Sequence, residues 1–491
     1  MSATRGVAWL AALSILSACA VGPNYKRPNV HAPKTYRGQV EPAQAQSLAD
    51  LRWWELYKDP RLQELIHTAL AQNLDLQIAV ARVEEARARA HAANADFYPS
   101  VSGTLSTAAN PAMATVVPGA TPGTVDIQRT PEGSSYSGGA QLSWEIDFFG
   151  RVRRSSQAAR ADLLASEEGR KAAVSSLVAQ VATTYFNLRI LDAQRDITLH
   201  TIASDEASLK LVRAQMRGGV ASATEEQQAL GQLASVRAQL PDIEQQIAQA
   251  EDQLSVLLGQ NPGAVERPGG EDGQPVPVDV PAGLPSDLLE RRPDIRQAEE
   301  QLAAATARIG VAKAQTFPFP RIFLTAFAGA VSGSLSALLR GNGAGESSLG
   351  PGVTWPLLDL GGHANVGVAE AQAKEAALTY RSIILNALRE VADALSALQT
   401  VRTEIEQHAV QTKAGKEYAR LTDLRYKGGV SSYLEVLDAE RQYYSAQIDY
   451  QSARLKQLQD LVTLYKALGG GWSEADRMTG VPAERPAGKT E

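Results

Sequence analysis

The chain has 491 residues, 21% of them charged, and a formal net charge of −6 at neutral pH. This acidic balance argues against a nucleic-acid-binding surface, which needs clustered positive charge. Segments rich in Ala, Leu, Gln and Glu predict long helices rather than several separate compact cores. No His-Glu-x-x-His, phosphate-binding Gly-rich loop or nucleophile–base pair can be assembled from the sequence, so an enzyme is the weaker hypothesis.

The N-terminus predicts a lipoprotein signal peptide. Arg5 lies in a short charged start, an apolar run extends from Val7 to Leu16, and Leu16-Ser17-Ala18-Cys19 has the pattern of a lipobox. Removal of residues 1–18 would leave Cys19, the only cysteine, as a lipidated first residue. Ala20 follows rather than an Asp that retains lipoproteins at the inner membrane, so the outer membrane is the expected location. A non-lipidated signal peptide with a chance cysteine is the alternative.

Later membrane crossings would have to use strands, because no later segment reaches the ~18 apolar residues of a spanning helix. Residues Gln141 to Phe148 alternate between apolar and polar side chains, which predicts a strand facing two solvents. Three further candidate strands run from Val101 to about Thr107, from Arg321 to Val331 and from Gly352 to Leu358. The edge of a soluble sandwich is the alternative. Four strands cannot close a barrel in lipid, so spanning strands would require several protomers, with twelve or eight strands in all.

Long helices are predicted between these strands. The stretch from Arg151 to Gln215 lacks Pro and would form a helix much longer than a bilayer is thick. Pro241 predicts that the returning helix bends or breaks near Leu240. The second half has no Pro between Pro356 and Pro482, so its hairpin should be straighter.

A repeated turn divides the chain into two similar halves. The stretch Gly218-Gly219-Val220-Ala221-Ser222, followed by Glu225, returns as Gly428-Gly429-Val430-Ser431-Ser432 with Glu435, at an offset of 428 − 218 = 210. Each copy lies between long helical segments and reads as the tip of a helical hairpin. Ordered matches at turns and strand ends predict two homologous halves rather than a chance likeness of Ala-rich helices.

Several motifs together resemble one known family. They are the lipobox followed by Val21-Gly22-Pro23-Asn24-Tyr25, the strand end Asp359-Leu360-Gly361-Gly362, the tip segment Arg425-Tyr426-Lys427-Gly428-Gly429-Val430, the helix start Tyr433 to Arg441, and Leu464 to Trp472. This combination looks like the outer-membrane efflux factors, the TolC-like proteins, in the lipoprotein branch that contains OprM and NodT.

The resemblance implies a mixed α and β fold. Three copies would form a twelve-stranded transmembrane β-barrel, with four strands from each protomer, continued by a long periplasmic α-helical coiled-coil barrel. The function implied is passive export of small molecules, as the outer-membrane channel of a three-part pump. Its partners would be a periplasmic adapter (membrane fusion) protein and an inner-membrane pump of the resistance-nodulation-division type. No cofactor beyond the lipid on Cys19, no metal site and no nucleic acid are expected. The alternatives are a periplasmic coiled-coil scaffold lipoprotein and the outer-membrane conduit of a type I protein secretion system.

The expected organisation has six parts. They are the signal peptide (1–18), a lipidated N-terminal and equatorial segment (19–60), a first repeat (61–260, with a β-hairpin at 100–148 and a tip near 218–222), an equatorial linker (261–285), a second repeat (286–468, with a β-hairpin at 320–358 and a tip near 428–432) and a C-terminal equatorial tail (469–491).

By the same resemblance, the gate of the periplasmic entrance lies beside the second tip. Glu435 and Asp438 would narrow the pore, and their i, i+3 spacing places both carboxylates on one helix face. Tyr426 and Glu225 would form a latch between helices, and Leu434 an apolar constriction. A solvated helix face is the alternative for the two acids. Some relatives have an Arg where this chain has Ser431, so a second latch would be missing.

The tip turns are also expected to dock the adapter, because small residues let helix backbones approach closely. The candidates are Gly219, Val220, Ser222, Gly429, Val430 and Ser432. The alternative is that Gly serves only to reverse the chain.

Overall fold

The computed structural model describes residues 20–29, 33, 35–37, 48, 56–110, 113–118, 125–130, 133–268 and 288–470. The chain divides into two compact units. The first includes Glu84–Leu164 and Glu299–Leu378, and the second includes Ala165–Ala298 and the chain from Thr379 onward. The predicted signal peptide, Cys19, most of the predicted linker and nearly all of the predicted C-terminal tail lie outside the described residues.

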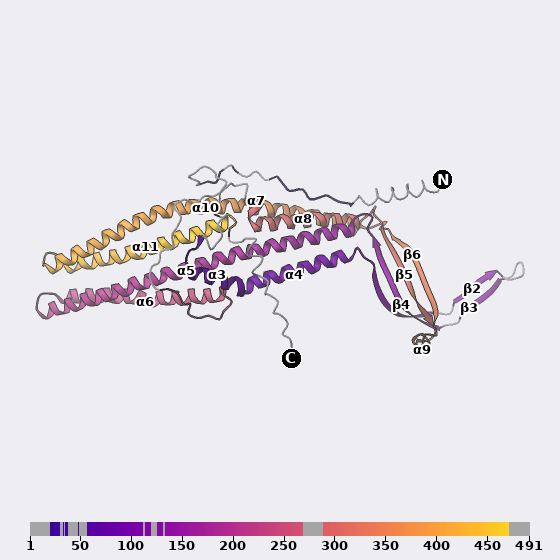
Figure 1. Cartoon of the computed structure of the whole chain (residues 1–491), viewed down its shortest axis with the longest axis horizontal. Helices are drawn as coiled ribbons and strands as arrows, with labels where there is room; N and C mark the ends of the chain where they lie inside the picture. The colour runs from indigo at the N-terminus through magenta and orange to yellow at the C-terminus, as the bar shows by residue number, and fades with distance from the viewer. Residues whose placement is uncertain are drawn as a thin grey trace, which may run out of the picture. The chain divides into compact units, whose positions relative to one another are not determined.

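The first unit contains a four-stranded antiparallel sheet. Its strands are β1 (Ser100–Asn110), β4 (Gly133–Ile146), β5 (Arg321–Ser332) and β6 (Ala344–Thr354), in the order β1-β4-β5-β6 (Figure 1). The central pair, β4 and β5, comes from different halves of the sequence, so the sheet joins the halves. β1 and β6 are its edge strands, and both carry exposed apolar side chains: Val101, Leu105, Leu349 and Val353.

Two insertions lie between these strands. β2 (Met113–Pro118) and β3 (Val125–Thr130) form a separate two-stranded sheet between β1 and β4. The short helix α9 (Leu335–Leu339) lies between β5 and β6, and its first turn is capped by the Ser334 hydroxyl, which accepts from the Ala337 amide at 3.3 Å.

The strand predicted from Gly352 to Leu358 is misplaced, since β6 begins at Ala344 and ends at Thr354. The predicted end at Phe148 is also late, because β4 ends at Ile146. In both places an Asp starts a helix instead. The Asp147 carboxylate accepts from the Val152 and Arg153 amides, and the Asp359 carboxylate accepts from the Gly362 amide at 2.7 Å. Such side-chain capping satisfies amides that a helix start leaves unpaired, so the strand cannot continue.

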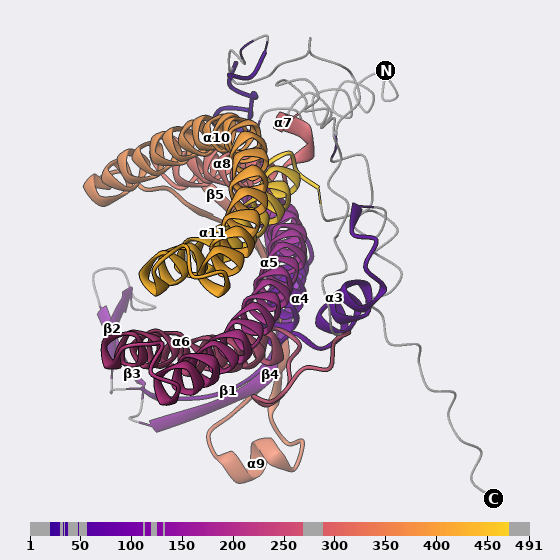
Figure 2. The ribbon, with the colours of Figure 1, turned by 90° about the vertical axis from the view of Figure 1, so that its left-hand side faces the viewer.

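Two long helical hairpins follow the two β-hairpins. The helices are α5 (Arg151–Arg217), α6 (Ala223–Leu257), α10 (Leu360–Lys427) and α11 (Tyr433–Ala467). The outgoing helices have 67 and 68 residues and the returning helices have 35 each. The figures show α5 beside α6 and α10 beside α11 (Figure 1, Figure 2). None of the helices in the described ranges is both long enough and apolar enough to cross a membrane.

Of the predicted bend or break near Leu240, the break does not occur, because α6 continues through Pro241 to Leu257. A Pro inside a helix removes one backbone hydrogen bond and costs ~3 kcal/mol. Packing around it offsets this cost: Val236 and Ile243 on either side of Pro241 are both buried. The Arg237 guanidinium one turn earlier also pairs with Glu206 of α5.

The described chain also contains four shorter helices. They are α3 (Pro60–Gln72), α4 (Leu74–Ala95), α7 (Leu288–Arg291) and α8 (Pro293–Ala314). In the second unit, the fully buried Tyr57 ring packs edge-on against Phe186 and Tyr465, with centroids 6.0 and 6.3 Å away. The Tyr185 hydroxyl donates to Asp59, the N-cap of α3, at 2.7 Å. These aromatic contacts tie α3 to helices from both hairpins.

Matching side chains close the base of each hairpin. The Asn73 amide donates to the Leu257 carbonyl at the end of α6, at 3.0 Å. The Arg292 guanidinium donates to the Ala467 carbonyl at the end of α11, also at 3.0 Å. The two carbonyls are 467 − 257 = 210 residues apart, the offset of the repeated turn.

In the first unit, the chain just after Cys19 is fixed where β4 passes into α5. The Val21 amide donates to the Phe149 carbonyl at 3.0 Å, and the Arg154 guanidinium donates to the Val21 and Gly22 carbonyls. Gly22 has a φ of +94°, and a Cβ there would lie 2.5 Å from the Gly310 Cα, so only Gly fits this contact.

Candidate functional site at the hairpin tips

The two repeated turns have the same backbone structure. In the first, Gly219 has a φ of +76° and the Val220 amide donates to the Gln215 carbonyl at 2.9 Å. In the second, Gly429 has a φ of +74° and the Val430 amide donates to the Arg425 carbonyl at 2.9 Å. A left-handed Gly closing the last turn of a helix in this way ends the helix and reverses the chain. Val220 and Val430 are left 81% and 71% exposed, so each tip presents an apolar side chain.

The helices that leave the two turns are capped differently. Ser222 and Glu225 form a capping box: the Glu225 amide donates to the Ser222 hydroxyl, and the Ser222 amide donates to the Glu225 carboxylate at 3.2 Å. Ser432 occupies the same position before α11 but makes no side-chain cap bond. Within the described chain, the Glu435 carboxylate has no hydrogen-bond or ion-pair partner. The matching acids Glu225 and Glu435 therefore differ: one caps its helix and the other is free.

The predicted gate residues of α11 lie on its first two turns. Glu435 is half-buried, and Leu434 is 59% exposed. Asp438 is exposed and accepts from the Gln442 amide at 2.7 Å. Arg441 does not pair with Asp438, because its guanidinium donates to Gln232 of α6 at 2.6 Å.

Tyr426 does not make the hydrogen bond predicted for it. Its hydroxyl donates to the Gln215 side chain of α5 at 2.9 Å, rather than to Glu225, whose carboxylate caps α6. Partial burial, and then the nearby Glu225 charge, raise the pKa of Tyr426. The phenol therefore still links the two hairpins, and its ring lies 5.3 Å from that of Tyr433.

A buried apolar cluster between the hairpins was missed by the sequence reasoning. We call it the seam cluster; it consists of Leu209, Val212, Ala229, Leu233, Tyr433, Val436 and Leu437. Its members come from α5, α6 and α11, and so pack the first hairpin against the returning helix of the second. Further from the tips, the Tyr444 hydroxyl of α11 donates to Gln239 of α6 at 2.6 Å. The tips are thus held together by apolar packing with polar links at its border.

The seam also buries charge. Asp205 of α5 is 3% exposed, and Glu440 of α11 has one carboxylate oxygen fully buried. A sequence signal existed for the first of these residues. Asp205 shares a helical stripe with the buried Leu209 and Val212, at the three- and four-residue spacing of a core face.

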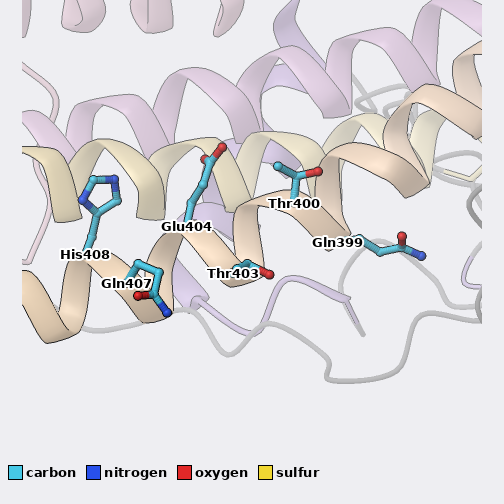
Figure 3. A pocket seen from close by; sticks show the side chains of 6 residues that line it. All are labelled: Gln399, Thr400, Thr403, Glu404, Gln407 and His408. Carbon is cyan, nitrogen blue, oxygen red and sulfur yellow. The ribbon is translucent and has the colours of Figure 1, made fainter.

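The described residues also form an open surface hollow of about 560 Å³ along α10. Its lining comes from one helix face: Gln399, Thr400, Thr403, Glu404, Gln407 and His408 (Figure 3). The Glu404 carboxylate pairs with Lys456 of α11 at 2.9 Å, and His408 Nδ1 lies 3.1 Å from the Gln411 side chain. None of the predicted gate or docking residues lines this hollow. In the ranges that the structure describes, no group of three or more His, Cys, Asp or Glu side chains could hold a metal ion.

Comparison with known proteins agrees with this arrangement of sheet, paired hairpins and tips. A sequence model described as "Outer membrane efflux protein" matches residues 65–260 and again residues 284–470. The chain belongs to this outer membrane efflux protein family. It is accordingly an outer-membrane component of an efflux system.

Relatives match along nearly the whole chain. The toluene efflux pump outer membrane protein TtgC of Pseudomonas putida is 35% identical over 94% of this chain and 94% of its own length. The outer membrane protein OprJ of Pseudomonas aeruginosa is 34% identical over 96% of each chain. Among solved structures, the outer-membrane channel OprN is 31% identical, with a TM-score of 0.82 over 92% of this chain and all of that chain. The fold is thus that of outer-membrane efflux channels.

Proposed function

We propose that this protein is the passive outer-membrane channel of a three-part efflux pump and has no enzymatic activity. Three copies pool their sheets into one barrel of 3 × 4 = 12 strands and their helical hairpins into a periplasmic tunnel. A periplasmic adapter and an inner-membrane pump of the resistance-nodulation-division type deliver the cargo to the hairpin tips. The cargo is a small toxic molecule, and the name of TtgC favours an apolar one.

The sheet is the observation that carries this proposal. Its edge strands β1 and β6 bear exposed apolar side chains, as expected of strands that meet lipid and pair with neighbouring copies. A soluble sheet with two such edges would be prone to aggregate.

Three observations support the division of the chain into two repeats. The family model matches twice, the two tip turns have the same backbone bonds, and Asn73 and Arg292 bind equivalent carbonyls. We assign the division into two repeats on this basis, with the boundaries predicted from the sequence.

Conductance measurements test the function directly. Purified protein inserted into planar lipid bilayers should form discrete, long-lived pores, and a deletion strain should become sensitive to apolar toxic compounds. A protein that binds membranes through its lipid but never conducts would instead fit the scaffold hypothesis. Affinity capture of the intact envelope complex would then identify the adapter and pump, and would separate drug efflux from protein secretion.

The acids of α11 should control ion selectivity. Replacing Glu435 and Asp438 together by Ala is expected to raise single-channel conductance and to lower the cation-over-anion permeability ratio several-fold. In three copies the change removes six carboxylates from one narrow ring, where their summed potential concentrates cations. Reversal potentials in a salt gradient measure the ratio, and an unchanged value would remove both residues from the pore.

Glu225 provides a matched control for Glu435, since the two acids are 435 − 225 = 210 residues apart. Glu225→Ala should change selectivity much less, because the capping bond holds this carboxylate against the first turn of α6 and only the acids of α11 are proposed to line the pore. Its cost should instead appear as a loss of roughly 1 kcal/mol in stability. Equal selectivity changes at the two positions would contradict the assigned asymmetry.

Adapter docking can be tested at the tip serines. Ser432→Phe is expected to reduce site-specific crosslinking to the adapter by about tenfold, because a large ring prevents close approach of the adapter helix. A tenfold loss corresponds to ~1.4 kcal/mol of binding free energy, the size expected for a residue at the centre of an interface. The Ser432 hydroxyl makes no cap bond, so the change should leave the protein's stability intact. Ser222→Phe should reduce crosslinking similarly but also lose its capping bond, whereas Ser222→Thr keeps it. Normal crosslinking with both Phe variants would limit the turns to reversing the chain.

A further inference from the structure

Two carboxyl groups at the seam between the hairpins, one buried and one half-buried, lack the partners that buried charges need. Asp205 of α5 is 3% exposed, and neither of its carboxylate oxygens has a hydrogen-bond partner in the described chain. The buried Oε2 of Glu440, on α11, also lacks a partner there. An ionised carboxylate in such a position is costly, so the group is stable there mainly when it carries a proton.

The neighbouring polar groups do not neutralise the pair. Arg441 on α11 lies nearby, but its Nε donates to Gln232 of α6 and it forms no ion pair with either acid in the described chain. On α10, Asp423 adds a further negative charge and is itself paired with Lys427 at 2.7 Å. Below the pair, towards the tips, lies the seam cluster, whose Tyr433 hydroxyl contributes no positive charge.

These surroundings favour protons on both acids. Burial, and then the charges of Asp205 and Asp423, raise the pKa of Glu440 to about 7. Burial raises the pKa of Asp205 to about 6, against the opposing effects of Gln232 and Arg441. The same carboxylates, after burial itself, raise the pKa of the Tyr433 phenol, which therefore stays neutral at physiological pH.

We propose that Asp205 and Glu440 form a proton-binding site that holds the two hairpins together near their tips, and that losing its protons separates the tips. The role of this separation in opening the periplasmic mouth rests on the proposed channel function. The site differs from the gate acids Glu435 and Asp438, which lie on the first two turns of α11. Asp205 lies on α5 and is buried, and Glu440, on the next turn of α11, has one buried carboxylate oxygen.

The direction of the pH effect follows from comparing the packed seam with separated hairpins. In separated, hydrated hairpins the two groups would titrate near their ordinary pKa values of 3.8 and 4.5, below their values in the packed seam. The protonated carboxyl groups therefore stabilise the packed seam fully below about pH 4. This stabilisation is lost as the pH rises through 6 and 7 and the protons leave. Acid closes the seam and neutral to alkaline pH loosens it.

Bilayer recordings of the full-length protein at pH 5.5 and pH 8, at constant ionic strength, test this assignment. The wild-type open probability should rise at least tenfold between these pH values, because the pKa of each acid lies about two units above its ordinary value in the packed seam and one unit corresponds to a factor of ten. Glu440→Gln and Asp205→Asn keep the side-chain shape but cannot ionise, so each should reduce or abolish the rise and keep the seam packed at pH 8. Glu206→Gln, at the exposed neighbour that pairs with Arg237, should keep the wild-type response.

A second readout does not require a pore. Spin labels at Val220 and Val430 report the separation of the two tips, in samples diluted with unlabelled chain. The distance should lengthen from pH 5.5 to pH 8 in the wild type and remain short in Glu440→Gln and Asp205→Asn. A distance change without conductance would support the proton site and overturn the channel function. Conducting pores whose pH response and tip distances are the same in both amide variants as in the wild type would overturn the proton site alone.

Discussion

Replacing Gly139 by Val is expected to prevent assembly of the four-stranded sheet. Gly139 of β4 pairs directly with Gly329 of β5, and a Cβ at Gly139 would lie 2.5 Å from the Ala328 carbonyl oxygen and 2.6 Å from the Gly329 Cα. These are backbone atoms of the paired strand and cannot move aside as a side chain could. The Phe327 ring also covers the position, with its Cζ 2.8 Å away. A destabilisation of about 3 kcal/mol or more is expected, at the upper end of overpacking effects.

The measurement is heat-modifiable migration of the outer-membrane fraction, together with the amount of protein that reaches the membrane. Gly103→Val is the matched control: Gly103 lies on the edge strand β1, opposite Ala140, and no atom outside its chain neighbours lies within 4 Å of its Cβ position. The control should assemble like the wild type. Normal assembly of Gly139→Val would mean that β4 and β5 do not pair in this register.

Arg292→Met is expected to destabilise the second unit by ~2–3 kcal/mol, because it leaves the buried Ala467 carbonyl without its donor and removes the hydrogen bonds to two partly exposed carboxylates, Asp294 and Glu390. Arg292 is only 8% exposed. Its guanidinium binds Asp294 through two nitrogens at 3.0 and 2.7 Å, Glu390 of α10 at 2.8 Å, and the Ala467 carbonyl. One side chain thus joins the start of α8 to both helices of the second hairpin.

Denaturant unfolding of the purified protein in detergent measures this loss. Arg389→Met provides the comparison: it removes an ion pair with Asp393 in which both side chains are more than 60% exposed, and such pairs contribute less than ~1 kcal/mol. Arg292→Lys should lie between the two, since an ammonium keeps the charge but lacks the planar pair of nitrogens that binds Asp294. If Arg292→Met and Arg389→Met cost the same, Arg292 would not stabilise the hairpin base.

Local sequence patterns predicted the elements of this fold better than their ends. Alternation from Gln141 located the second half of β4, and the absence of Pro located α5. The end of β4 was misjudged because Asp147 was counted with the strand, whereas its carboxylate caps α5. The strand predicted from Gly352 to Leu358 covers only the end of β6, because the earlier part of β6 lies in a Gly- and Ser-rich stretch that was predicted to be a loop. Pro241 does not end α6, because the packing of its neighbours keeps the helix continuous.

The candidate site was predictable only where it depends on one segment. The turns followed from Gly219 and Gly429, which supply a backbone conformation that few other residues adopt. The partner of Tyr426 depends on which acid is already engaged elsewhere, and this is decided in three dimensions. Burial of Asp205 and Glu440 likewise requires two helices that are far apart in the sequence to meet.

The fixed segment after Cys19 has a consequence for how the protein is placed in its membrane. Only Ala20 separates Cys19 from the hydrogen bond between Val21 and Phe149, and Ala20 itself packs closely against Gly150. One residue spans about 3.8 Å. If the proposed barrel forms and Cys19 carries acyl chains, the lipid would therefore lie at a fixed depth relative to the strand ends and would limit how far these ends can rise or sink in the bilayer.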